Sequence, residues 1–202
     1  SNRTRPEDKK NFTLLLQELR NKLDEARQKD GKPYLLTIAA GASSSYVANT
    51  EMDKVAATVD WINLMTYDYH GSWEKTANHH APLYSDPKRP ATSGASANDT
   101  VNFFLKAGVP PSKLVLGIPF YGRGWTGCET TGNGLAQACK GLSDGVVAAG
   151  VHEFGNLEKQ GWIGGNGFVR YWDDVAKVPW LYKKMTGTFV TYEDPESLAY
   201  KA

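Results

Sequence analysis

The chain has 202 residues, of which 41% are hydrophobic and 22% are charged, and this composition is typical of one sizeable globular domain. Its 23 Lys and Arg residues balance 22 Asp and Glu residues, so the formal net charge of +1 predicts no broad attraction to nucleic acid or to an anionic membrane. No run of 18 or more apolar residues occurs, and the opening SNRTRPEDKK lacks the apolar stretch of a signal peptide, so we predict neither a membrane span nor an export signal within the chain.

The first half of the sequence alternates helical and strand patterns. Between residues 12 and 26 one helical face is predicted to hold Phe12, Leu15, Leu16, Leu19, Leu23 and Ala26. The apolar run YLLTIAAGA, residues 34–42, predicts a buried strand that fits a parallel sheet. A second helix is predicted from Thr50 to Val59, and VDWINLMTYD, residues 59–68, predicts the second strand.

A polar loop over residues 75–97 separates the second strand from a third helix, on which Val101, Phe104 and Leu105 share one side. The run KLVLGIPFYGR, residues 113–123, predicts the third strand. This alternation predicts right-handed βα units and a parallel sheet. Ligand sites in α/β proteins lie where such strands end.

The regular alternation stops at Gly124. From there to about Tyr192, glycine, aromatic and turn residues predict short antiparallel strands, as in GGNGFVRYWDD. The last residues, DPESLAYKA, predict the first turns of another helix. We therefore predict βα units over residues 1–123, an α+β subdomain over 124–192 and the start of a further helix over 193–202.

The two cysteines, Cys128 and Cys139, lie in a loop-like segment rich in Gly, Thr and Asn. Their spacing permits a local disulfide that closes a small loop, and two unpaired thiols are the alternative. A disulfide would favour an extracellular protein.

Six Trp, ten Tyr and seven Phe residues make the chain rich in aromatic side chains, many of them in glycine-rich segments. Such residues stack on the apolar faces of sugar rings, or they serve only as core and surface anchors. Composition leaves both interpretations open.

Polar and aromatic residues gather directly after the second predicted strand, where Tyr67, Asp68, Tyr69 and His70 follow one another. They could serve a metal, a proton transfer or a polar ligand. The set Asp68, His70, His79 and His80 matches no metal-ligand spacing, so no metal is predicted. Neither a G-x-S-x-G elbow nor a phosphate-binding loop is present, and no cofactor is predicted.

Several blocks, in order, resemble the later part of the catalytic domain of a glycoside hydrolase family 18 chitinase. They are INLMTYDYHGSWE, HHAPLY, KLVLGIPFYGRGW, DDVAKVPWLY and TFVTYEDPESL. The resemblance extends from Pro6 to Ala202. It implies an α/β fold, a partial (β/α)8 TIM barrel with three parallel strands recognisable, and an α+β insertion subdomain beside the substrate cleft.

The resemblance implies hydrolysis of β-1,4 linkages between N-acetylglucosamine units of chitin, with retention of configuration. The acetamido oxygen of the substrate attacks the anomeric carbon, so no protein nucleophile is needed. Tyr67 would hydrogen-bond this oxygen, and Met65 would restrict rotation of the acetamido group. Asp68 would bind the reacting sugar or orient its neighbours.

Other matching positions imply contacts with substrate. Tyr121 and Arg123 match family positions near the cleavage point, and both are expected at the end of the third strand. Trp73 lines the cleft or only anchors its loop, and His70 is expected to be structural. Chitin or chitooligosaccharides are the expected partners, nucleic acid and membranes are not, and the protein is expected to be secreted.

One part of the family pattern is absent from the sequence. The general acid of the family ends a D-x-x-D-x-D-x-E motif on the fourth barrel strand, and no such spacing occurs here. A full barrel takes about 250 residues. We therefore expect a fragment that is inactive alone and associates with the missing half of the barrel or with another copy.

Two readings besides the chitinase share this fold. One is a chitinase-like lectin that holds sugar without cleaving it, and the other is an enzyme that acts on the N-glycans of glycoproteins. Tyr67 and Asp68 together favour hydrolysis, because a lectin has less need to support an oxazolinium intermediate.

Overall fold

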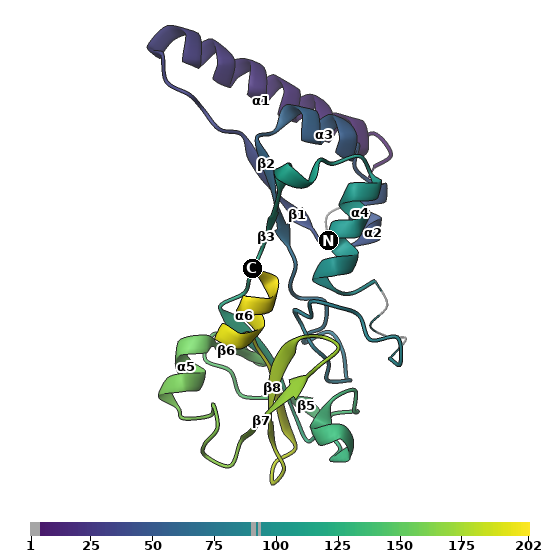
Figure 1. The fold of residues 1–202 in the computed structure, drawn as a ribbon, viewed down its shortest axis with the longest axis vertical. Helices are drawn as coiled ribbons and strands as arrows, with labels where there is room; N and C mark the ends of the chain where they lie inside the picture. The colour runs from purple at the N-terminus through teal and green to yellow at the C-terminus, as the bar shows by residue number, and fades with distance from the viewer. Residues whose placement is uncertain (1–4, 90–91, 93) are drawn as a thin grey trace. The chain divides into compact units, whose positions relative to one another are not determined.

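The computed structural model describes residues 5–89, 92 and 94–202 (Figure 1). Packing divides the chain into two compact units. The first unit comprises Ser1–Met65 and Asp99–Gly117, and the second comprises Thr66–Asn98 and Ile118–Ala202. The predicted division placed residues 66–98 with the βα units, whereas packing groups them with the later part of the chain.

The first unit contains a three-stranded parallel sheet in the order β1-β2-β3. Its strands are β1 (Thr37–Gly41), β2 (Trp61–Met65) and β3 (Leu114–Leu116). The connecting segments contain α1 (Asp8–Asp30), α2 (Ser44–Ala48), α3 (Met52–Thr58), α4 (Ala97–Lys106) and the 3-10 turn η2 (Pro111–Lys113). The predicted βα order and the parallel pairing are confirmed. Helix α2 was not predicted, because five residues are too few to show an apolar period.

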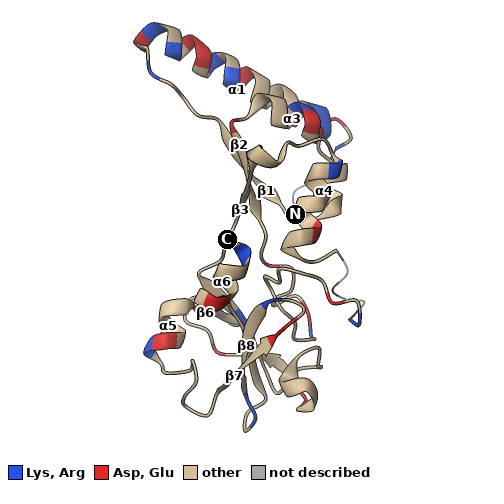
Figure 2. Cartoon of the chain, in the orientation of Figure 1, with Lys and Arg blue, Asp and Glu red and all other residues tan. Residues whose placement is uncertain are grey.

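The core of the first unit lies between this sheet and its helices. Val55 of α3, Ile62 of β2 and Phe104 of α4 have no exposed surface. The predicted apolar face of α1 is wrong in part, because Leu15 is 56% and Leu19 is 42% exposed. A helical face is buried only where another element covers it, and the described residues of this unit cover other positions of α1. Charges of both signs alternate along this helix (Figure 2).

The single strand predicted over residues 113–123 is two strands in the structure. β3 ends at Leu116, and Tyr121 begins β4 (Tyr121–Thr126), which belongs to the antiparallel sheet of the second unit. Pro119 separates the two strands and has no N–H to donate to a strand ladder. Arg123 and Tyr121 therefore lie on an antiparallel strand, and their predicted place at the end of the third parallel strand is wrong.

The second unit is built on an antiparallel sheet in the order β5-β4-β9-β8-β7, and β6 also pairs with β4. The remaining strands are β5 (Gly141–Leu142), β6 (Val151–Glu153), β7 (Val169–Asp173), β8 (Val178–Lys183) and β9 (Thr188–Thr191). Its helical segments are η3 (Thr131–Gly134), α5 (Phe154–Lys159) and α6 (Pro195–Lys201). Every residue of β9 is buried. The short antiparallel strands predicted for this part of the chain are present.

A disulfide joins Cys128 and Cys139 in the second unit. The loop that it closes pairs with the segment after Trp73. The backbone N–H of Cys139 donates to the carbonyl of Lys75 at 2.8 Å, and that of Ala77 donates to the carbonyl of Gln137 at 3.0 Å. The disulfide loop therefore holds the segment that leads from Trp73 to the two adjacent histidines.

Candidate active site

Asp68 forms the centre of a polar cluster in the second unit. Its carboxylate accepts two parallel hydrogen bonds from Arg123, from Nε to Oδ1 at 2.9 Å and from Nη2 to Oδ2 at 2.8 Å. This two-point geometry fixes the plane of the carboxylate as well as its distance. The backbone of Asp68 has φ 59°, in the left-handed region that few residues other than glycine adopt.

The surroundings of Asp68 favour its ionised form. Burial alone would raise the pKa of this carboxyl, but interactions with His80, Arg123 and Tyr121 outweigh burial and hold the pKa well below its usual range. Burial, together with the Asp68 carboxylate, raises the pKa of the Tyr121 hydroxyl. At neutral pH the site therefore presents a carboxylate beside a protonated phenol.

Aromatic rings surround the guanidinium of Arg123. The Arg123 Cζ atom lies 5.5 Å from the centre of the Trp73 ring and 5.4 Å from that of Tyr121. Tyr67 meets Tyr121 edge to face, with ring centres 6.2 Å apart. Trp73 is 59% exposed, so it packs on Arg123 and keeps free surface that a sugar ring could contact.

The structure thus brings together five of the six residues predicted for catalysis and substrate binding. They are Tyr67, Asp68, Trp73, Tyr121 and Arg123. The sixth, Met65, ends β2 in the first unit and is 37% exposed. Its contact with an acetamido group stays a prediction.

His70 is buried, and its Nδ1 atom lies 2.8 Å from the Glu74 carboxylate. This contact lies within one loop. No group of three or more metal-ligating side chains that could hold a metal ion is found in the part of the chain that the structure describes. Within the same part, no helix is long and apolar enough to cross a membrane.

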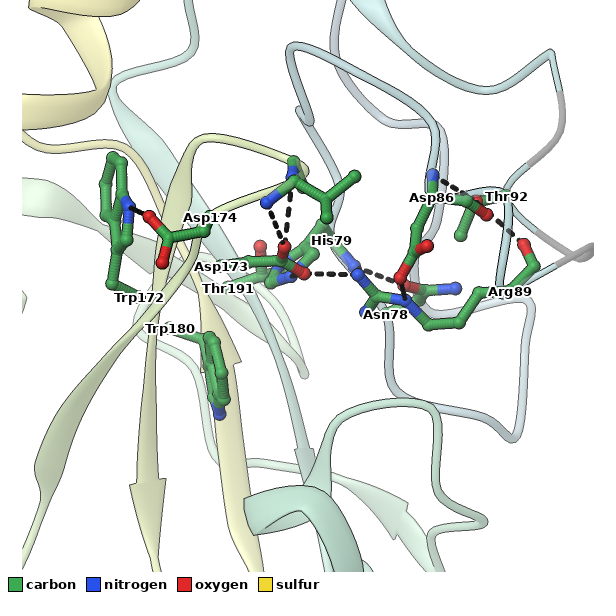
Figure 3. A network of polar contacts seen from close by, with 12 residues as sticks. Asn78, His79, Asp86, Arg89, Thr92, Trp172, Asp173, Asp174, Trp180 and Thr191 are labelled. Atoms are coloured by element: carbon green, nitrogen blue, oxygen red, sulfur yellow. Dashed lines mark hydrogen bonds and ion pairs between the residues drawn. The ribbon is translucent and has the colours of Figure 1, made fainter.

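A buried network that the sequence did not indicate connects the loop after Trp73 to β7 (Figure 3). His79 Nε2 lies 3.1 Å from Asp173 Oδ2, and Arg89 contacts this same carboxylate oxygen. Arg89 also donates to Asp86 at 2.8 Å, and Asp173 Oδ1 accepts the backbone N–H of Ala176 at 2.9 Å. Burial would raise the pKa of Asp173, but these interactions hold it well below its usual range.

His80 is the functional candidate that sequence reasoning missed. Its side chain is fully buried, and its Nδ1 atom lies 3.6 Å from Asp68 Oδ1. The centre of its ring is 5.4 Å from that of Tyr121. The only available signal was the position of His80 in the HHAPLY block, because the histidines match no metal-ligand spacing.

The sequence model described as glycosyl hydrolases family 18 matches residues 1–202, and the chain belongs to this family. The chain is 54% identical over 207 residues to Chitinase A1 of Niallia circulans, and the match covers 99% of this chain and 29% of that protein. It is 37% identical over 202 residues to Chitotriosidase-1 of Mus musculus, and the match covers 96% of this chain and 41% of that protein.

Solved structures agree with this assignment. Chitinase ChiA74 from Bacillus thuringiensis has a TM-score of 0.94 at 49% identity, covering all of this chain and 34% of that one. The family 18 N-acetylglucosaminidase from Paenibacillus barengoltzii has a TM-score of 0.87 at 40% identity, and the match covers 98% of this chain and 56% of that one. The chain therefore spans 29% to 56% of the lengths of these relatives. The predicted fold class, βα units of a TIM barrel with an α+β subdomain, is confirmed.

Proposed function

We propose that the protein is a chitinase that hydrolyses β-1,4 linkages between N-acetylglucosamine units, with the acetamido group of the substrate as the nucleophile. Relatives at 54% and 37% identity are named as a chitinase and a chitotriosidase. A family structure at 28% identity, the Ostrinia furnacalis group IV chitinase, was solved in complex with allosamidin. The observation that carries the proposal is the meeting of Tyr67, Asp68, Tyr121 and Arg123 in one cluster.

Tyr67, Asp68 and Arg123 each have a role in this reaction. The Tyr67 hydroxyl donates to the acetamido oxygen and holds it within reach of the anomeric carbon. That oxygen bonds to the anomeric carbon as the glycosidic C–O bond breaks, which gives a positively charged oxazolinium. The ionised Asp68 stabilises the developing charge, and Arg123 keeps its carboxylate oriented.

The leaving oxygen must receive a proton from a general acid. The family motif that supplies this acid, D-x-x-D-x-D-x-E, does not occur in the sequence. The residues of this chain therefore serve the nucleophile side of the reaction and the binding of the sugars. The disulfide between Cys128 and Cys139 supports action outside the reducing cytosol.

A chimera tests these roles directly. Residues 1–202 replace the matched segment of Chitinase A1 of Niallia circulans, and turnover of a fluorogenic chitotriose glycoside is measured. Tyr67→Phe should lower kcat by about 10²–10³-fold, as expected for the loss of one donor that acts in the transition state. Tyr84→Phe is the matched control, because Tyr84 is a 44% exposed tyrosine with no role assigned here.

Two results would overturn the proposal. In the first, the Tyr67→Phe chimera turns over as fast as the unaltered chimera. In the second, the unaltered chimera binds triacetylchitotriose without turnover, which would favour the lectin reading. An NMR record of the first product should show the β-anomer, because the reaction retains configuration.

A further inference from the structure

His80 is buried in a way that needs an explanation. The side chain has no exposed surface, and neither Nδ1 nor Nε2 lies within ordinary hydrogen-bond distance of a partner among the described residues. The Asp68 carboxylate lies just beyond that distance, with Oδ1 3.6 Å from Nδ1. A buried polar group left without a close hydrogen-bond partner destabilises the folded state. A hydrophobic side chain of similar size would avoid this cost, so the imidazole is expected to serve a purpose other than stability.

The groups that face the ring come from several elements. Asp68 Oδ1 lies 3.6 Å from Nδ1, and Tyr121 on β4 packs against the ring. Arg123 on the same strand and Lys201 on α6 are the cations that act on it. Burial, with a smaller contribution from these cations, lowers the pKa of His80 although Asp68 opposes the shift. The ring is therefore neutral at pH 7 and carries one N–H.

Contacts on three sides hold the backbone around His80, and with it the point from which the ring projects toward Asp68. The side chain of His79 is held in the Asp173 network (Figure 3). The carbonyl of His80 accepts the backbone N–H of Tyr69 at 3.0 Å. The carbonyl of Ala81 accepts from Lys201 Nζ at 2.6 Å.

We propose that His80 is a positioning residue for Asp68: its buried imidazole, together with Arg123, fixes the orientation of the carboxylate and keeps water from its buried side. Arg123 Nε binds Oδ1 at 2.9 Å, and His80 Nδ1 faces the same oxygen. The inference rests on the catalytic role proposed for Asp68. It goes further because it assigns a second residue, after Arg123, to the orientation of that carboxylate.

Two replacements at His80 separate a role in positioning from a role in packing. His80→Leu fills much of the same space but removes the N–H, whereas His80→Asn keeps an N–H donor on the side of Nδ1. Leu157→Ala serves as a control for general loss of stability, because Leu157 is a buried core residue on α5 with no place in the site.

The experiment follows the Asp68 carboxyl carbon by NMR in the 202-residue chain as pH is lowered, over the range in which dispersed amide signals show that the chain is folded. In His80→Leu the Asp68 carboxyl should titrate about one pH unit higher than in the unaltered chain. His80→Asn should restore most of this shift, and Leu157→Ala should leave the titration unchanged. The Arg123 Nε–H signal, recorded at pH 7, should move in His80→Leu alone.

Three results would overturn the positioning role. The first is an unchanged Asp68 titration in His80→Leu, the second is no restoration in His80→Asn, and the third is an equal shift in Leu157→Ala. Calorimetric binding of triacetylchitotriose to the same samples tests the proposed function separately. If the titrations behave as expected but the unaltered chain and the chimera neither bind nor cleave the sugar, the proposed function fails and the positioning of Asp68 by His80 stands.

Discussion

Replacing Lys201 by Met should destabilise the chain by about 3–5 kcal/mol, because it leaves a buried carboxylate without its cation. Lys201 and Glu193 form an ion pair whose side chains are only 2% and 3% exposed. Lys201 Nζ also donates to the carbonyl of Ala81, and Glu193 Oε2 accepts from the Ser197 hydroxyl at 2.8 Å. Burial dominates both partners, since it raises the pKa of Glu193 and lowers that of Lys201.

The double variant Lys201→Met, Glu193→Gln removes both charges and keeps a group that can accept from Ser197. It should lower the free energy of unfolding by about 1–2 kcal/mol, because the carbonyl of Ala81 loses its hydrogen-bond donor and the new side chains pack imperfectly. The double variant should therefore cost about 2–3 kcal/mol less than Lys201→Met alone, so the single variants should not add and the coupling energy should exceed this difference. The size of this coupling distinguishes a buried pair from an exposed one, which contributes about 0–1 kcal/mol.

Urea unfolding followed by Trp fluorescence measures these free energies through the midpoint and the slope. Acid should partly rescue Lys201→Met, because the Glu193 pKa is raised in the folded state and rises further without Lys201. A group with a raised folded pKa stabilises the fold when protonated, so the deficit should shrink as pH falls below 7. A cost under about 1 kcal/mol for Lys201→Met, or a double variant that costs the sum of the singles, would refute this account.

Replacing Cys128 and Cys139 by Ser should lower the free energy of unfolding, measured in urea, by about 2–3 kcal/mol, the value for a loop with a sequence separation of 11. An unchanged free energy of unfolding would contradict this prediction. Asp173→Asn should destabilise at pH 7, and its deficit should narrow below about pH 4, because a depressed pKa contributes stability that is lost as the carboxylate is protonated. A constant deficit would argue against this linkage. In Gly124→Ala the new Cβ would overlap Ser143 Oγ, so the free energy of unfolding should fall by about 1–3 kcal/mol, and Ser143→Ala should partly restore it.

The repeating part of the fold could be predicted because each of its signals is local. Apolar runs bounded by turn residues marked the parallel strands, and helical spacing marked the helices between them. Strand ends were less certain, since the run over residues 113–123 stays apolar while the chain passes from one sheet to another. An apolar pattern reports burial, and it does not report which strand supplies the hydrogen-bonding partner.

The candidate site was predictable only in part, and for a related reason. Tyr67 and Asp68 stand in a peculiar motif, so the resemblance identified them. The pairing of Asp68 with Arg123 joins residues 55 positions apart and depends on where β4 crosses the second unit. The place of His80 depends on contacts that its neighbours make with β7 and α6. No local pattern encodes such contacts.

The left-handed backbone at Asp68 limits which substitutions the site can accept during evolution. Glycine and asparagine adopt φ near 59° most readily, whereas β-branched residues meet a steric cost there. Exchange to either of the two tolerated residues removes the negative charge while the loop keeps its course. Under the function proposed above, one exchange could therefore remove the Asp68 carboxylate that serves hydrolysis while the loop backbone stays unstrained.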